Sequence, residues 1–106
     1  MKMDNDEKLL RGQINLETAQ IAWRDLQRYF ASGATIFVSP ALDLVDVAYQ
    51  IAQDNAELVS AWMSEGRIAR VTDEQALGWY EADTIVWAVV ARPYVLIQEN
   101  RNVLHS

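Results

Sequence analysis

Ala34-Thr35-Ile36-Phe37-Val38-Ser39-Pro40 is the stretch that decides the fold class of this chain. Its first five residues are apolar and rich in β-branched side chains, so the sequence predicts a short buried strand over residues 34–38. The serine and proline that follow end the strand. Serine is a good helix cap and proline suits a first helical turn, so we expect a helix next, over residues 41–53.

An amphipathic helix precedes this strand. Apolar side chains recur with helical spacing over residues 23–32, and Gly33 follows as its stop. Further upstream, residues 7–13 show a weaker helical pattern, whereas residues 14–21 favour neither helix nor strand. The chain therefore leads into its central strand through a helix.

Two capping-box patterns organise the part of the chain after residue 53. Asp54 with Glu57 and Thr72 with Gln75 are each typical of a helix N-terminus. The elements expected beyond residue 53 are a helix to Glu65 with Gly66 as its stop, a strand over 67–71, a helix from Thr72 to Ala82, and the apolar segments 85–91 and 94–98. The last two segments form either a hairpin or one strand bent at Pro93.

The order of these elements predicts an α+β fold. From residue 23 it reads helix, strand, helix, helix, strand, helix, strand, strand, which matches a winged-helix-like core with a small antiparallel sheet. A plain α+β sandwich, with helices packed on a small antiparallel sheet, is the competing topology. We expect one domain over residues 1–106, with an ordered core at about 9–99 and polar tails at 1–8 and 100–106.

Composition narrows the class of protein. Hydrophobic residues make up 51% of the chain, which is enough for one core, and charged residues 23%. Cysteine is absent, which excludes disulfides and thiolate metal sites. The N-terminus lacks the apolar stretch of a signal peptide, and the longest apolar run, 85–91, is far shorter than the roughly 20 residues of a membrane helix. We therefore expect a soluble, cytoplasmic protein with no membrane contact.

The charge distribution disfavours nucleic acid as a partner. The formal net charge is −6, and no lysine or arginine occurs between Arg28 and Arg67. In a winged helix, the recognition helix would be residues 55–65, which carry Glu57 and Glu65 but no cation. Phosphates would be repelled from such a helix.

No catalytic, cofactor or metal site is predicted. Asp43, Asp46 and Asp54 could contribute oxygen ligands to Mg²⁺, but acidic residues near a helix N-terminus are explained as well by the helix dipole. His105 is the only histidine and is the penultimate residue. The glycines are too widely spaced for a phosphate-binding loop. We therefore expect no cofactor, and a protein that is not an enzyme.

Two groups of side chains are candidates for binding. Trp23 and Trp62 are expected in the core, since aromatic residues at helical spacing mostly are. The candidate interface or pocket residues are Trp79, Tyr80, Trp87 and Tyr94. The candidate anion contacts are Arg67, Arg70 and Arg92. The alternative, that they neutralise nearby acidic residues at the surface, is the more common role of such arginines.

The order of several short segments resembles a known family. The segments are Leu16-Glu17-Thr18-Ala19, Trp23 with Leu26 to Ala31, Leu42 to Val45, Trp62 with Gly66, and Trp87 to Val90 with Pro93 and Val95 to Glu99. Over about Leu9 to Glu99 the chain is similar to the small bacterial family called domain of unknown function 2288. This resemblance implies a bacterial cytosolic protein without an assigned activity, and it supplies no catalytic residues.

These observations favour a non-catalytic protein-interaction or homo-oligomerising module. A protein partner or a second copy is the expected partner. A nucleic-acid-binding regulator of the winged-helix type and a small-molecule sensor with an aromatic-lined pocket are the alternatives. Fold alone does not decide among the three.

Overall fold

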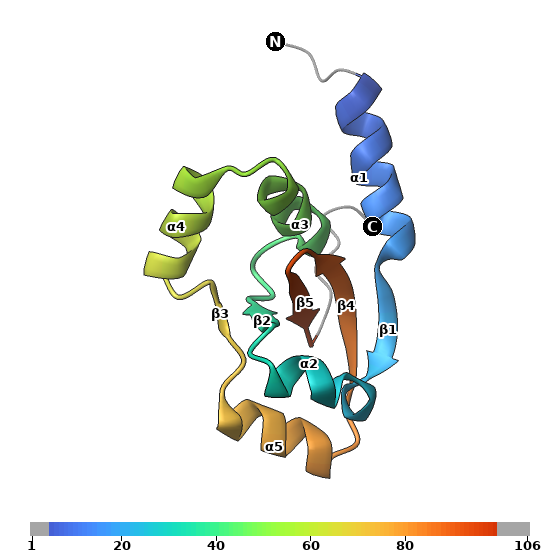
Figure 1. Ribbon diagram of the computed structural model, residues 1–106, viewed down its shortest axis with the longest axis vertical. Coiled ribbons are helices and arrows are strands. Elements are labelled where there is room, and N and C mark those ends of the chain that lie inside the picture. Colours follow the sequence, from blue (N-terminus) through green and yellow to red (C-terminus); the bar gives the residue numbers. More distant parts are fainter. Residues whose placement is uncertain (1–4, 100–106) are drawn as a thin grey trace.

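The computed structural model describes residues 5–99 and confirms the α+β class (Figure 1). Helices and strands alternate along most of the chain. The elements are α1 (Asn5–Glu17), β1 (Ala19–Ala22), the 3-10 helix η1 (Trp23–Leu26), α2 (Gln27–Ala31), β2 (Thr35–Val38), α3 (Leu44–Ala52), α4 (Ala56–Ser64), β3 (Ile68–Arg70), α5 (Asp73–Glu81), β4 (Ile85–Ala91) and β5 (Tyr94–Gln98). From residue 23 onward their order is the predicted one.

The five strands form one open sheet in the order β1-β4-β5-β2-β3. The pairs β1–β4, β4–β5 and β2–β3 are antiparallel, whereas β2 and β5 run parallel, with Thr35 opposite Val95 and Ile36 opposite Leu96. The sheet is therefore mixed and not purely antiparallel as predicted, and the winged-helix-like detail is not confirmed. More than fifty residues separate the paired strands β2 and β5, so no local turn fixes their relative direction.

The strand pairing resolves two segments whose structure the sequence left open. Residues 85–98 form a hairpin in which Ala91 lies opposite Tyr94, and Arg92 and Pro93, joined by a cis peptide bond, make the turn. The ambiguous residues 14–21 divide between the end of α1 and most of the edge strand β1.

The helix ends follow the expected chemistry at three places. Gly33 and Gly66 take positive φ angles of 78° and 73° just beyond α2 and α4, where residues with a side chain would be strained. The capping box at α5 is complete: the backbone N–H of Gln75 donates to Thr72 Oγ1 at 3.1 Å, and the N–H of Thr72 donates to Gln75 Oε1 at 3.0 Å. These signals were local enough to be predicted from the sequence.

Two other predicted caps are wrong, one by a single residue and the other by four. The N-cap of α4 is Asn55, not Asp54, because Asn55 Oδ1 accepts from the N–H of Leu58 at 3.3 Å. Asp54 instead takes a φ of 58° in the tight turn that reverses the chain after α3. Helix α3 begins later than expected, since Asp43 and not Ser39 caps it.

Hydrophobic side chains form two clusters, one on each face of the sheet. Successive side chains of β5 point to opposite faces of the sheet: Leu96 belongs to the first cluster, while Val95 and Ile97 belong to the second. The first cluster packs under α1, α3 and α4, and the second under η1, α2 and α5. Trp62 lies in the first cluster and Trp23 in the second, so both are core residues as predicted.

The side chain of Arg11 on helix α1 contacts Asp46 and Tyr49 on α3. Its guanidinium donates from Nε to Glu7 Oε2 at 2.9 Å, lies 3.0 Å from Asp46 Oδ1 through Nη2, and stacks over the ring of Tyr49 at 4.1 Å. Burial by itself would lower the pKa of Arg11, but the hydrogen bonds and charges of Glu7 and Asp46 outweigh it, so the pKa is raised. Within residues 5–99, no helix combines the length and the apolar character needed to cross a bilayer.

Candidate functional site

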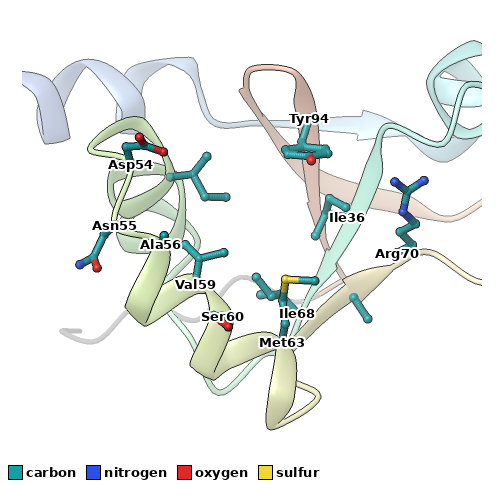
Figure 2. Close-up of a pocket in the computed structure, with 12 residues that line it drawn as sticks. Ile36, Asp54, Asn55, Ala56, Val59, Ser60, Met63, Ile68, Arg70 and Tyr94 are labelled. Atoms are coloured by element: carbon teal, nitrogen blue, oxygen red, sulfur yellow. The ribbon is translucent and has the colours of Figure 1, made fainter.

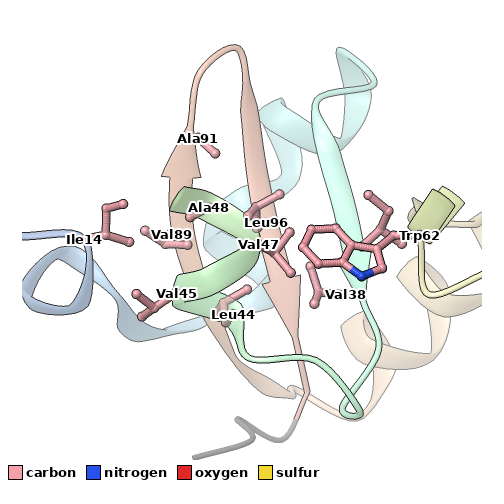
Figure 3. Packing of buried hydrophobic residues seen from close by; sticks show 11 residues of the cluster. Ile14, Val38, Leu44, Val45, Val47, Ala48, Trp62, Val89, Ala91 and Leu96 are labelled. Atoms are coloured by element: carbon pink, nitrogen blue, oxygen red, sulfur yellow. The ribbon is translucent and has the colours of Figure 1, made fainter. Parts of the chain in front are cut away.

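Helix α4 forms one wall of a groove on the first-cluster face of the sheet. Trp62 points into the core and is only 7% exposed (Figure 3). Ala56, Val59 and Met63, at helical spacing, face the groove instead. Met63 is 61% exposed, although helical spacing predicts that Leu58, Val59, Trp62 and Met63 form one buried stripe.

The opposite wall comes from the sheet. Ile36 of β2, Ile68 of β3 and Tyr94 at the start of β5 face α4 across the groove (Figure 2). The cavity between them has a volume of about 390 Å³, within the range of ligand-binding clefts. We call it the α4–β3 groove. Its lining is mainly apolar and includes no histidine or cysteine.

Opposite charges stand at two sides of the α4–β3 groove. Asp54 lies beside the start of α4, and Arg70 lies on the far side, next to Ile36 (Figure 2). Arg70 Nη1 donates to the carbonyl oxygen of Gly33 at 3.0 Å. A Cβ atom added at Gly33 would lie 2.7 Å from that nitrogen, so the glycine leaves room for the guanidinium. Arg70 is thereby held at the rim of the groove.

The four aromatic candidates are not gathered at one place. Tyr94 lines the α4–β3 groove, whereas Trp87 is half-buried against the first cluster. Trp79 is 6% exposed in the second cluster, edge-on to Trp23 with the ring centroids 5.1 Å apart. Tyr80 is 45% exposed and lies 4.7 Å beneath the guanidinium of Arg24. Of the four, only Tyr94 lies at the groove.

The three arginine candidates are likewise dispersed. Arg70 lines the groove, whereas Arg67 pairs with Glu65 at 3.0 Å and Arg92 is exposed in the hairpin turn. Their role as anion contacts stays a prediction. The structure does bring one aromatic and one arginine candidate, Tyr94 and Arg70, to the same cavity.

The three aspartates considered for Mg²⁺ have other contacts or positions. Asp43 caps α3, Asp46 pairs with Arg11, and Asp54 lines the groove. In the described part of the chain, residues 5–99, no three His, Cys, Asp or Glu side chains are grouped so as to hold a metal ion.

Several groove residues were not proposed from the sequence. The helical spacing of Val59 and Met63 predicted that both belong to the buried stripe of α4. Ile36 was expected in a buried strand, and Ile68 in a strand with one solvent-exposed face. The sequence does carry one signal: the apolar face of α4 has four large side chains, Leu58, Val59, Trp62 and Met63, and only Trp62 is buried. Which part of that face stays open depends on how the helix packs.

Comparison with known proteins places the chain in a family. Residues 9–99 match the family model described as protein of unknown function (DUF2288). The chain belongs to this family. The DUF2288 match confirms the resemblance seen in the sequence and covers nearly all the described residues.

A solved structure shares the fold. The NMR solution structure of PA1075 from Pseudomonas aeruginosa is 41% identical, covers 99% of both chains and has a TM-score of 0.76. No curated protein matches the chain. These comparisons fix the DUF2288 family and its fold but give no activity.

Proposed function

We propose that this DUF2288 protein is a non-catalytic protein-interaction module whose α4–β3 groove takes an apolar segment of a partner protein. The observation that carries the proposal is the groove itself, walled by Val59 and Met63 on α4 and by Ile36, Ile68 and Tyr94 on the sheet. Apolar clefts of this kind take up side chains of a docking segment, with methionine adapting to their shape.

The charges at the groove specify the partner further. Asp54 lines one side, and Glu57 follows in the first turn of α4, whereas Arg70 stands at the other side. The segment that complements this arrangement has an apolar centre, a cation at the Asp54 end and a carboxylate at the Arg70 end. A nucleic-acid backbone does not fit, because it would bring phosphates against Asp54 and Glu57.

A display library of random peptides tests the proposal with the full-length protein. The peptides recovered are expected to carry a basic residue, two or three apolar residues and an acidic residue, in either order along the peptide. NMR titration with a recovered peptide should shift the backbone signals of Ala56, Ser60 and Ala69, which line the groove. Arg70→Glu should favour peptides that carry a second cation in place of the carboxylate.

Met63→Lys is expected to weaken peptide binding at least about tenfold, because it places a solvated ammonium group in the apolar cavity. Isothermal titration calorimetry measures the change. Leu77→Lys on α5 is the matched control, since Leu77 is 59% exposed and Met63 61%. Both variants should unfold at nearly the same temperature as the natural protein, because both side chains are exposed.

Three results would contradict the proposal. They are the absence of any enriched peptide, undiminished binding by Met63→Lys, and groove signals that respond only to small apolar carboxylic acids. The last result would support a small-molecule sensor instead.

A further inference from the structure

Helix α1 presents an apolar face that nothing in the described chain covers. Its inner side packs through Leu10 and Ile14 against the first cluster. Its outer side carries Leu9 and Leu16, which are 71% and 86% exposed, the highest values among the large hydrophobic residues described. Residues seven apart lie within about 20° of each other around a helix, so the two leucines form one line. Figure 1 shows α1 along one side of the molecule, with its first turns clear of the other helices.

Gly12 lies between these leucines, in the middle of the helix. A Cβ atom added there would meet nothing within 4 Å, and the φ angle of Gly12 is not positive. Glycine is among the least favourable residues in a helix interior, and no packing contact within residues 5–99 accounts for it. A second helix backbone passing close to this position would account for it. We call Leu9, Gly12 and Leu16 the α1 seam.

We infer that a second copy of this chain pairs through the α1 seam, with the two helices side by side and parallel. The charges beside the seam select both the partner and the direction. On a helical wheel, Lys8 flanks the seam on one side, and Asp6 and Glu17 flank it on the other. A parallel two-fold pair brings opposite flanks together, so Lys8 meets the acidic flank of the partner. An antiparallel pair would bring equal flanks together and set Asp6 near the partner's Glu17.

The seam predicts a weak dimer. Leu9 and Leu16 are separated by about 10 Å along the helix, so the contact is at the small end of specific interfaces. Association is therefore expected in the range of about 10 µM to 1 mM. This surface is separate from the α4–β3 groove.

Sedimentation equilibrium of the full chain over that concentration range tests the inference. The natural protein should form a dimer, and the double variant Leu9→Gln, Leu16→Gln should associate at least about tenfold more weakly. Glutamine keeps the net charge and suits a helix, so the fold should be unaffected. Leu77→Gln, at another exposed leucine, should dimerise like the natural protein. A strict monomer at about 1 mM, or a dimer that the double variant leaves unchanged, would overturn the inference.

Gly12→Ala separates a role in pairing from a role in the helix. Alanine should raise the unfolding temperature of the dilute monomer by roughly 3 °C, because it is the better helix former. It should nevertheless weaken the dimer several-fold, since its methyl group stands between the two backbones. A variant that gains stability without losing association would contradict the close approach.

Single cysteines test the parallel direction, since the natural chain contains none. In a parallel pair, Leu9→Cys and Leu16→Cys should each form a disulfide with an identical chain on mild oxidation. Leu77→Cys should not do so. Disulfides that appear only when Leu9→Cys and Leu16→Cys are mixed would show an antiparallel pair and overturn the charge argument.

The two interaction proposals can fail independently. The Leu9→Gln, Leu16→Gln variant is expected to keep the peptide binding of the α4–β3 groove, and Met63→Lys is expected to keep the dimer. Loss of both properties in either variant would indicate unfolding, which the far-ultraviolet circular dichroism spectrum detects.

Discussion

Trp23→Ala is expected to lower the free energy of unfolding by about 4 kcal/mol, a large part of the total for a domain of this size. Trp23 is 0% exposed at the centre of the second cluster. Its ring lies edge-on to Phe30 and Trp79, with centroid distances of 5.7 and 5.1 Å. Its indole N–H donates to the carbonyl oxygen of Ala76 at 3.0 Å. Alanine would leave a large cavity and remove a link between η1 and α5.

Urea unfolding followed by circular dichroism measures this loss. Trp23→Phe should cost less than Trp23→Ala, because it keeps most of the apolar volume and gives up only the hydrogen bond and part of the ring. Leu77→Ala is the control at an exposed helical site, and its effect should stay within about 0.5 kcal/mol. A loss below about 1 kcal/mol for Trp23→Ala would show that the second cluster does not depend on this side chain.

The sequence allowed Trp23 to be assigned to the core because the signal was local. Helical spacing over residues 23–32 marked the buried face, and the Thr72–Gln75 pair marked the start of α5. The same local patterns predicted the order of elements from residue 23 to the end of the chain. The single helix expected over residues 23–32 is in fact two elements, because its first turn is the 3-10 helix η1 and α2 follows.

Strand pairing could not be predicted in the same way. β2 and β5 are adjacent and parallel although α3, α4, β3, α5 and β4 separate them in the chain. Their pairing depends on which faces the helices cover, which no short window of sequence contains. β1 was missed because Ala19 to Ala22 is a short edge strand whose side chains are partly exposed, so its pattern is weak.

In the α4–β3 groove too, single residues could be picked out from the sequence, but their meeting at one cavity could not. Tyr94 and Arg70 were singled out separately, Tyr94 as a candidate interface or pocket residue and Arg70 as a candidate anion contact. The structure joins them because β5 and β3 both flank β2 in the sheet. Helical spacing predicted that Met63 belongs to the buried stripe of α4, but the packing of α4 leaves its side chain 61% exposed.

Gln98→Leu is expected to destabilise the protein by about 2 kcal/mol, although it replaces a polar side chain by an apolar one of similar size. Gln98 is 0% exposed, and its Nε2 donates to the carbonyl oxygens of Ser39 and Leu42, both at 2.9 Å. These bonds join the end of β5 to the loop that leads into α3. Leucine fills the space but donates no hydrogen bond, so the loop loses this attachment.

Gln98→Glu gives the sharper result, because its effect on the free energy of unfolding should change with pH in the direction opposite to that of an ordinary, ion-paired carboxylate. The ionised carboxylate would be buried, would donate nothing and would face two carbonyl oxygens, so the folded state should raise the pKa of the new carboxyl above its unfolded value of about 4.3. A group that binds its proton more tightly when folded adds stability as the pH falls from above its folded pKa towards its unfolded pKa. The variant should therefore be less stable than Gln98→Leu at pH 7 and should recover as the pH falls to about 5.

Urea unfolding of the natural protein, Gln98→Leu and Gln98→Glu at several pH values decides the matter. The amide and the leucine do not titrate, so the difference between Gln98→Glu and Gln98→Leu isolates the new carboxyl from the other acidic groups. If the difference in unfolding free energy between these two variants does not change with pH, water reaches the side chain at position 98. That result would contradict the conclusion that a buried Gln98 attaches the Ser39–Leu42 loop.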